Sequence, residues 1–168
     1  VERTNSLITR FLDFARPLEL RLLPTDVGET IDHVIAQLER QQPPIGVTVY
    51  RNYSPDLRPI PLDAELIERV FYNLILNAAQ ASAEGGTVTV KTRPLGTGAE
   101  VSVIDRGVGI AEGQKENIFN PFVTTKAAGV GLGLAIVAKI VDQHKGRITV
   151  ESEPGQGSIF HVFLPGAA

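Results

Sequence analysis

FYNLILNAAQAS, residues 71–82, has the apolar spacing of a buried helix, yet it carries Asn73 and Asn77 four residues apart and Gln80 three further on. In an α-helix these positions share one face, which Glu84 would extend. A buried amide without partners costs about 1–3 kcal/mol. Two explanations are open. Either backbone or water satisfies the amides, or their oxygens, which are hard neutral ligands, hold a Mg²⁺ ion that bridges to phosphates.

The composition is that of a soluble globular domain. The 168 residues are 43% hydrophobic and 21% charged, which suits one domain with a sizeable core. The net charge of −3 gives no electrostatic case for a nucleic-acid or membrane-surface binder, so local geometry would have to hold an anionic ligand. Cysteine is absent, which suits a reducing cytoplasm, and no apolar run approaches the roughly 20 residues that span a bilayer. Methionine is also absent, even at position 1, so we expect a fragment of a longer protein.

Periodicity and turn residues predict the order of the elements. A helix over 3–15, stopped by Pro17, has the uncapped start of a longer helix's tail, and an extended linker follows over 17–24. Further helices are predicted over 26–41 with Thr25 as N-cap, over 63–83 with Asp63 as cap, and over 131–143. Strands are predicted over 47–53, 58–63, 87–93, 99–105, 146–152 and 158–164, the last four as two hairpins. This order predicts an α+β domain over 25–168, with the hairpins in one sheet and three helices on one face.

The segment VIDRGVGI (103–110) ends an apolar strand with an acid. The carboxylate of Asp105 could accept a hydrogen bond from the amino group of a purine, and Gly107 and Gly109 would allow a close approach. The alternative is a plain turn, because Asp-x-Gly is also a turn signal.

The irregular stretch 106–130 leads to a second glycine cluster. AGVGLGLAIV (128–137) places Gly129, Gly131 and Gly133 ahead of a helix, where backbone amides bind anions, although a flexible hinge would have the same composition. A stretch of this length without periodicity is usually functional.

Between the glycine clusters lies IFNPFVTTK (118–126). The hydroxyls of Thr124 and Thr125 and the ammonium of Lys126 could close over a phosphate, with Phe119 and Phe122 as anchors. The alternative is a surface loop with an apolar plug.

In this order the four segments resemble the catalytic, ATP-binding domain of sensor histidine kinases, a branch of the GHKL (Bergerat-fold) superfamily of gyrase, chaperone and mismatch-repair ATPases. NLILNAAQA resembles the N box, DRGVGI the first glycine box, IFNPFVTTK the F box and GVGLGLAIV the second glycine box. Residues 1–16 resemble the end of the second helix of a dimerisation domain, and Gln80 with TTK leans towards the nitrogen-regulation type. The resemblance implies a two-layer α/β sandwich with a mixed, mostly antiparallel sheet and three helices on one face.

The same resemblance implies ATP and Mg²⁺ as ligands. Asn77 would bind the metal, and Asn73 would support the metal and the phosphates as the second catalytic amide. Asp105 would bind the adenine amino group. The other nucleotide-binding residues, in the pocket, the lid and its hinge, would be Gln80, Gly107, Gly109, Ile110, Phe122, Thr124, Thr125, Lys126, Gly129, Gly131, Leu132, Gly133 and Leu134.

One position separates the branches of the superfamily. Hydrolytic members carry, four residues before the metal-binding Asn, a Glu that activates water, and here that residue is Asn73, which cannot take a proton. The resemblance therefore implies transfer of the γ-phosphoryl group to a histidine. A hydrolytic relative, a non-catalytic nucleotide-binding module and a serine kinase that inhibits sigma factors are the alternatives.

The chain departs from the family pattern twice. Val130 stands where the second glycine box usually has Thr, and the phosphoacceptor motif, a His followed by Glu or Asp, is absent. We interpret His33, His144 and His161 as structural, and we expect the acceptor on an upstream dimerisation domain. The implied partners are ATP, that domain in a homodimer and a response regulator, with no nucleic acid. The implied location is the cytoplasm, whether or not the parent protein is membrane-anchored.

Overall fold

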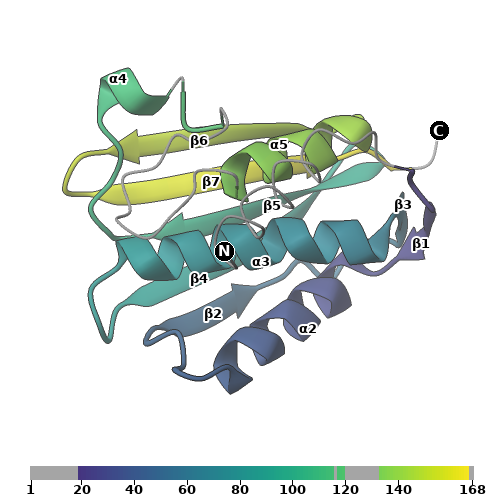
Figure 1. Ribbon diagram of the computed structural model, residues 1–168. Helices are drawn as coiled ribbons and strands as arrows, with labels where there is room; N and C mark the ends of the chain where they lie inside the picture. Colours follow the sequence, from purple (N-terminus) through teal and green to yellow (C-terminus); the bar gives the residue numbers. More distant parts are fainter. Residues whose placement is uncertain (1–18, 116, 120–132, 167–168) are drawn as a thin grey trace, which may run out of the picture.

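The computed structural model describes residues 19–115, 117–119 and 133–166. Along the chain the elements are β1 (Leu23–Thr25), α2 (Val27–Arg40), β2 (Thr48–Asn52), β3 (Ile60–Leu62), α3 (Ala64–Ala81), β4 (Thr87–Leu95), β5 (Gly98–Asp105), α4 (Glu112–Lys115), α5 (Gly133–Gln143), β6 (Arg147–Glu153) and β7 (Gly157–Leu164). Figure 1 shows α2, α3 and α5 side by side over one face of the main sheet. The opposite face of the sheet carries no helix among the described residues.

The main sheet has five strands in the order β2-β4-β5-β7-β6. The pair β2 and β4 is parallel and the other three pairs are antiparallel, so the mixed, mostly antiparallel sheet is confirmed. Both predicted hairpins are present. β4 extends further than predicted, to Leu95, and includes Pro94, which the sheet tolerates because β2 pairs only with Thr87 to Lys91.

The core lies between this sheet and the three helices. Helix α3 crosses the middle of the core. Residues three and four apart in a helix point the same way, so the apolar residues of α3 form one face, and that face is buried. Its buried residues are Ile67, Val70, Phe71, Leu74, Ile75, Ala78 and Ala79. They meet alternate residues of the central strands, which are Val88, Val90, Val101, Val103, Phe160 and Val162.

The predicted cap of α3 is confirmed and that of α2 is wrong. Asp63 accepts a hydrogen bond from the Leu66 N–H (3.2 Å) at the start of α3. At α2 the cap is Asp26, which accepts from the Glu29 N–H (3.0 Å). Thr25 belongs instead to β1, which pairs antiparallel with β3 at one end of the molecule.

Four further predictions need correction or fall outside the described residues. The linker predicted over 17–24 contains the start of β1, and a short helix, α4, lies in the stretch predicted to be irregular. Helix α3 ends at Ala81, so the polar stripe stops at Gln80 and does not reach Glu84. The helix predicted over 3–15 lies outside the described residues.

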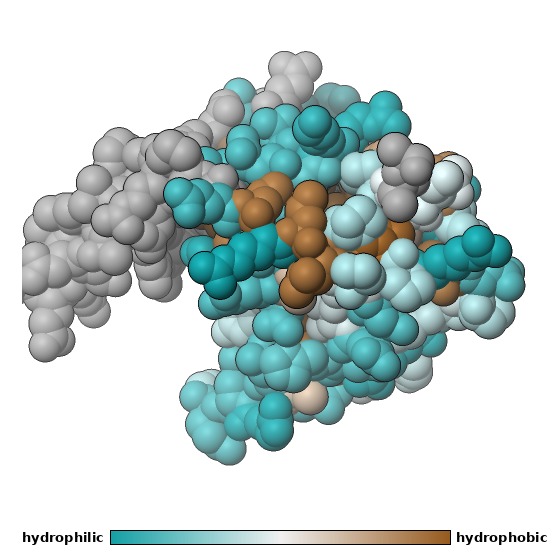
Figure 2. Space-filling model, turned by 90° about the vertical axis from the view of Figure 1, so that its right-hand side faces the viewer, coloured by the Kyte–Doolittle hydropathy of each residue, from teal (hydrophilic) through white to brown (hydrophobic). Residues whose placement is uncertain are grey.

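The end of the molecule formed by β1 and β3 carries an apolar patch within a largely hydrophilic surface (Figure 2). Viewed from this side, hydrophobic residues gather in the middle of the face (Figure 2). Leu22 and Leu23, at the start of β1, are 50% and 67% exposed. In the part of the chain that the structure describes, no helix has the length and apolar character that crossing a membrane requires.

Candidate functional site

The two amides of α3 are half-buried and lie one helical turn apart. The Asn73 Nδ2 donates to the carbonyl of Arg69 (2.8 Å), so the nitrogen of this amide is bonded within its own helix. This bond turns the Asn73 Oδ1 towards the start of α5, where it lies 3.4 Å from the position that a Cβ on Gly133 would occupy. The oxygen is therefore presented to the end of a neighbouring helix. Gln80, near the end of α3, is exposed.

The loop after β5 packs against the end of α3. Its first turn is closed by the Gly107 N–H, which donates to the Asp105 Oδ1 (2.8 Å). A Cβ on Gly107 would lie 2.1 Å from the Ala81 carbonyl oxygen, so only glycine fits between the loop and the helix. The next residue, Val108, donates its N–H to the same carbonyl (3.1 Å). These contacts set Asp105 beside the amide-bearing helix.

The other side of the loop rests on the turn between β6 and β7. Gly109 has φ +73°, and a Cβ there would lie 2.1 Å from the Glu153 carbonyl oxygen. The Gly155 N–H donates to the Val108 carbonyl (2.8 Å), and the Ile110 N–H donates to the Ser152 Oγ (2.7 Å). The loop is thus held from two sides.

Asp105 is an acid buried at the bottom of this loop, with 4% of its surface exposed. Burial raises its pKa above the ordinary value of 3.8, and the backbone N–H groups of Gly107 and Ser158 oppose that rise. The carboxylate therefore carries a cost in the folded protein at neutral pH. A ligand that donates a hydrogen bond to it would offset that cost.

The first backbone N–H groups of a helix have no partner within the helix and can bind an anion, and Gly133 and Leu134 lie at this end of α5. Gly133 is exposed, and Leu134 is half-buried against the core. Phe119 contacts Phe160 edge-on, with ring centroids 6.2 Å apart. The other predicted residues of the lid and hinge lie outside the described residues; they are Phe122, Thr124, Thr125, Lys126, Gly129, Gly131 and Leu132.

Among the described residues, the fold therefore places the 105–110 loop against the C-terminal end of α3 and Gly133 beside Asn73 of the same helix. Sequence reasoning missed the residues of β6 and β7 that support them. Ser152 donates to the Gly157 carbonyl (3.0 Å) and lies 2.7 Å from the Ser158 Oγ, and a Cβ on Gly157 would lie 2.2 Å from the Asp105 carbonyl oxygen. Only the cross-strand register, which pairs Asp105 with Ser158, could have identified them.

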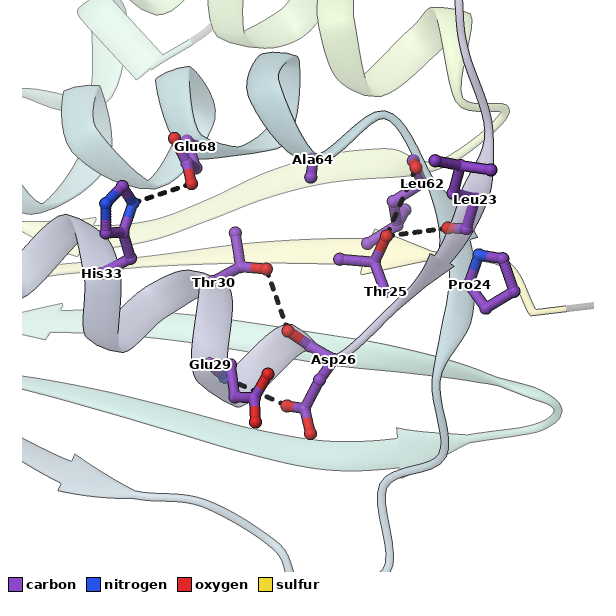
Figure 3. A pocket seen from close by; sticks show the side chains of 10 residues that line it. All are labelled: Leu23, Pro24, Thr25, Asp26, Glu29, Thr30, His33, Leu62, Ala64 and Glu68. Atoms are coloured by element: carbon purple, nitrogen blue, oxygen red, sulfur yellow. Dashed lines mark hydrogen bonds and ion pairs between the residues drawn. The ribbon is translucent and has the colours of Figure 1, made fainter.

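Two cavities lie away from these motifs. One, of about 360 Å³, opens between β1 and the starts of α2 and α3, where His33 is bonded to Glu68 (2.8 Å; Figure 3). The other, of about 240 Å³, lies on the open face of the sheet.

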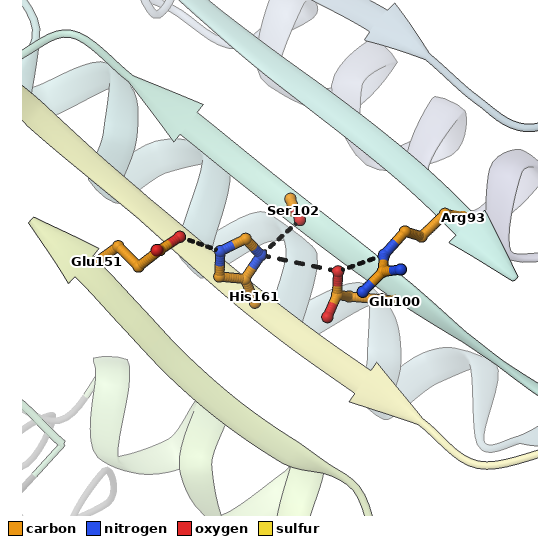
Figure 4. A network of polar contacts seen from close by, with 5 residues as sticks. All are labelled: Arg93, Glu100, Ser102, Glu151 and His161. Carbon is orange, nitrogen blue, oxygen red and sulfur yellow. Dashed lines mark hydrogen bonds and ion pairs between the residues drawn. The ribbon is translucent and has the colours of Figure 1, made fainter. Parts of the chain in front are cut away.

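The cavity on the open face is lined by a polar network (Figure 4). His161 lies 2.7 Å from the Ser102 Oγ and 2.6 Å from a Glu151 oxygen. The hydrogen bond from Arg93 holds the pKa of Glu100 below its ordinary range. These pairs join neighbouring strands, which is consistent with a structural His161.

Among the described residues no group of three His, Cys, Asp or Glu side chains could hold a metal ion.

The chain matches the family described as histidine kinase-, DNA gyrase B-, and HSP90-like ATPase over residues 62–168, which is more than half of its length. It belongs to this family. It is 37% identical to the sensor histidine kinase ZraS of Klebsiella oxytoca over 165 residues, which cover 98% of this chain and 36% of ZraS. The chain thus spans about a third of the length of this curated relative.

Solved structures agree with this assignment. Full-length ShkA in complex with AMPPNP superposes with a TM-score of 0.87 at 29% identity, over 99% of this chain and 36% of ShkA. The catalytic domain of the histidine kinase ThkA gives 0.76 at 33% identity, over 89% of this chain and 97% of that domain. ThkA in complex with the response regulator TrrA gives 0.83 at 28% identity, over 99% of this chain and 48% of ThkA. The predicted fold, the sandwich of histidine kinase catalytic domains, is confirmed.

Proposed function

We propose that this chain is the ATP-binding catalytic domain of a two-component sensor histidine kinase that works in the cytoplasm. The γ-phosphoryl group of ATP passes to a histidine on the dimerisation domain of the same protein, and then to a response regulator. An imidazole nitrogen forms a bond to the γ-phosphorus as the bond from that phosphorus to the β–γ bridging oxygen breaks, and ADP leaves. The complex of ThkA with its response regulator supports the last partner.

The observation that carries this proposal is the state of Asn73. Its amide nitrogen is committed to the Arg69 carbonyl, and its oxygen faces the start of α5. An amide oxygen in that place can orient a ligand but cannot deprotonate water. Phosphoryl transfer needs positioning and charge neutralisation more than a base, so the arrangement favours transfer over hydrolysis.

The donor set also fits the expected cofactor. Amide oxygens from Asn73 and Asn77 are hard, neutral ligands, which suit Mg²⁺ when phosphate oxygens and water complete its coordination. Bound there, the ion would neutralise charge on the phosphates. Asp105, at the other end of the site, would accept a hydrogen bond from the adenine amino group.

The experiment is a titration of the chain with a non-hydrolysable ATP analogue, with and without Mg²⁺. We expect binding that requires Mg²⁺, no phosphorylation of this chain by ATP alone, and acid-labile phosphate on a separate dimerisation domain added as acceptor. Steady turnover of ATP by the chain would favour a hydrolytic relative. Absence of binding in both titrations would favour a non-catalytic module, and acid-labile phosphate on the chain itself would contradict the proposal.

Replacing Asp105 by Asn should change the affinity for nucleotide and the stability of the fold in opposite directions, so the two roles of this carboxylate can be measured separately. Because burial raises the pKa of this carboxyl, the folded protein holds the proton more tightly than the unfolded chain does. The ionised form therefore lowers stability above that pKa, and stability is regained as pH falls from the folded pKa towards 3.8. Asp105→Asn should be at least as stable as the wild type at pH 7, and should lack this part of the pH dependence.

The same substitution should weaken binding of the ATP analogue about tenfold, because an amide nitrogen would face the adenine amino group where an acceptor is needed. Urea unfolding at pH 7 and pH 4, together with the titration, measures both effects. Unchanged affinity in a folded Asp105→Asn chain would refute the adenine assignment.

A further inference from the structure

A buried polar junction lies outside the candidate site, at the opposite end of α5. His144, directly after this helix, is only 6% exposed. Its Nε2 accepts a hydrogen bond from the backbone N–H of Asp63 (3.1 Å), and its Nδ1 lies 2.8 Å from the Ile140 carbonyl oxygen. Since a backbone N–H can only donate and a carbonyl can only accept, the ring is neutral with its proton on Nδ1. The ring thus joins α5 to the residue that begins α3.

Asp63 extends this junction to the segment that leads into the domain. Its Oδ1 caps α3, its Oδ2 accepts from the backbone N–H of Arg21 (3.0 Å), and its own N–H is held by His144. One residue therefore connects three parts of the chain: residues 19–25, the start of α3 and the end of α5. A shift of any one of them changes the hydrogen bonds of the other two.

The segment 19–25 is weakly held. Each of its residues is exposed or half-buried, and β1 is only three residues long. The cavity of about 360 Å³ lies beside it (Figure 3), so space is available next to β1. Segments with few buried apolar contacts open at a low cost in free energy.

The end of α5 is firmly held. The Gly146 N–H donates to the Val141 carbonyl (2.9 Å), and Lys145 adopts φ 61°, the left-handed conformation that commonly ends a helix. The helix is about 16 Å long. A displacement at its C-terminal end therefore reaches its N-terminal end, where Gly133 faces the Asn73 oxygen.

We propose that His144 is a positioning residue: its ring couples residues 19–25 to the position of α5, and thereby to the affinity of the site for nucleotide. The coupling rests on the proposed ATP binding. It assigns a role in control of the kinase to a histidine that touches neither nucleotide nor metal. In this role a movement of residues 19–25 is passed to α5 through the hydrogen bond from the Asp63 N–H to the His144 Nε2.

The chain offers matched variants for both ends of this connection. Arg21→Pro removes the backbone N–H that donates to Asp63, whereas Arg21→Ala keeps it. His144→Asn places an amide at the Nδ1 position and keeps the donor to Ile140, but it has no acceptor for Asp63. His144→Gln places an acceptor at the Nε2 position.

The test is the affinity for a Mg²⁺-bound, non-hydrolysable ATP analogue in the four combinations of Arg21→Pro with His144→Asn. We expect Arg21→Pro to weaken binding about fivefold when His144 is present, and to have little effect in the His144→Asn background. Arg21→Ala should match the wild type, and His144→Gln should restore most of the response to Arg21→Pro. Equal effects of Arg21→Pro in both backgrounds, or no effect in either, would overturn the coupling.

Hydrogen exchange of the nucleotide-free chain separates this inference from the proposed function. Arg21→Pro should speed amide exchange in α5 when His144 is present and should leave it unchanged in His144→Asn. If the wild type bound no nucleotide, the proposed function would fail while this measurement still tested the junction. If Arg21→Pro left amide exchange in α5 unchanged while His144 is present, the coupling would be refuted, whatever the affinity for nucleotide.

Discussion

Replacing Asn77 by Ala should lower the affinity for the Mg²⁺-bound ATP analogue by about a hundredfold or more, while the chain stays folded. Asn77 lies in α3 one helical turn after Asn73, which faces Gly133, and one turn before Ala81, whose carbonyl accepts from the Val108 N–H. Its amide oxygen is the proposed protein ligand of the metal, and alanine has no atom to replace it. Because the residue is half-buried and lies beside the core rather than in it, the loss of packing should be small.

The measurement is a calorimetric titration of wild type and Asn77→Ala with and without Mg²⁺. Asn52→Ala is the control, since Asn52 is an exposed residue at the end of β2, on the far side of the sheet order from α5. We expect the control to bind as the wild type does, and Asn77→Ala to bind equally weakly with and without the ion. An Asn77→Ala chain that unfolds would show that the amide is structural, and one that still responds to Mg²⁺ would show that the metal lies elsewhere.

The elements that sequence predicted well are those whose pattern is local. The long helix over 63–83 has a cap, an apolar stripe and a stop signal within its own residues, and α3 lies within those bounds with Asp63 as its cap. The predicted start of α2 lies one residue before the observed start, because Thr25 and Asp26 are both good N-caps. Pairing of β1 with β3 decides between them, since it commits Thr25 to a strand. No local pattern contains that information.

The candidate site divides in the same way. Its amides, its acid and its glycines lie within short sequence motifs. Those motifs can be recognised from residues that are neighbours in the sequence. Their supports are not local: Ser152 holds the Ile110 N–H across 42 residues, and His144 holds the Asp63 N–H across 81. A serine in a strand and a histidine after a helix are ordinary residues until the sheet register and the packing of α5 against α3 set their partners.

The glycines of the 105–110 loop allow a sharper test, because the chain contains natural controls for each of their properties. Gly113, in α4, has no atom within 4 Å of the position that a Cβ would occupy, and it has no positive φ. Gly46 has φ +76° but equally open space. Gly107 has no positive φ, but its Cβ would meet a backbone oxygen at 2.1 Å, and Gly109 combines such a clash with φ +73°.

Alanine substitutions at these four positions should therefore form a graded series in urea unfolding. Gly113→Ala should cost nothing, Gly46→Ala about 1 kcal/mol from backbone strain, and Gly107→Ala about 3 kcal/mol from the clash with α3. Gly109→Ala should cost the most, about 4 kcal/mol or more, because strain and clash add. Both loop variants should also lose nucleotide binding at protein concentrations and temperatures where they remain folded. If Gly107→Ala were no worse than Gly46→Ala, the loop could leave the end of α3 freely, and the close packing that sets Asp105 beside the amides would be refuted.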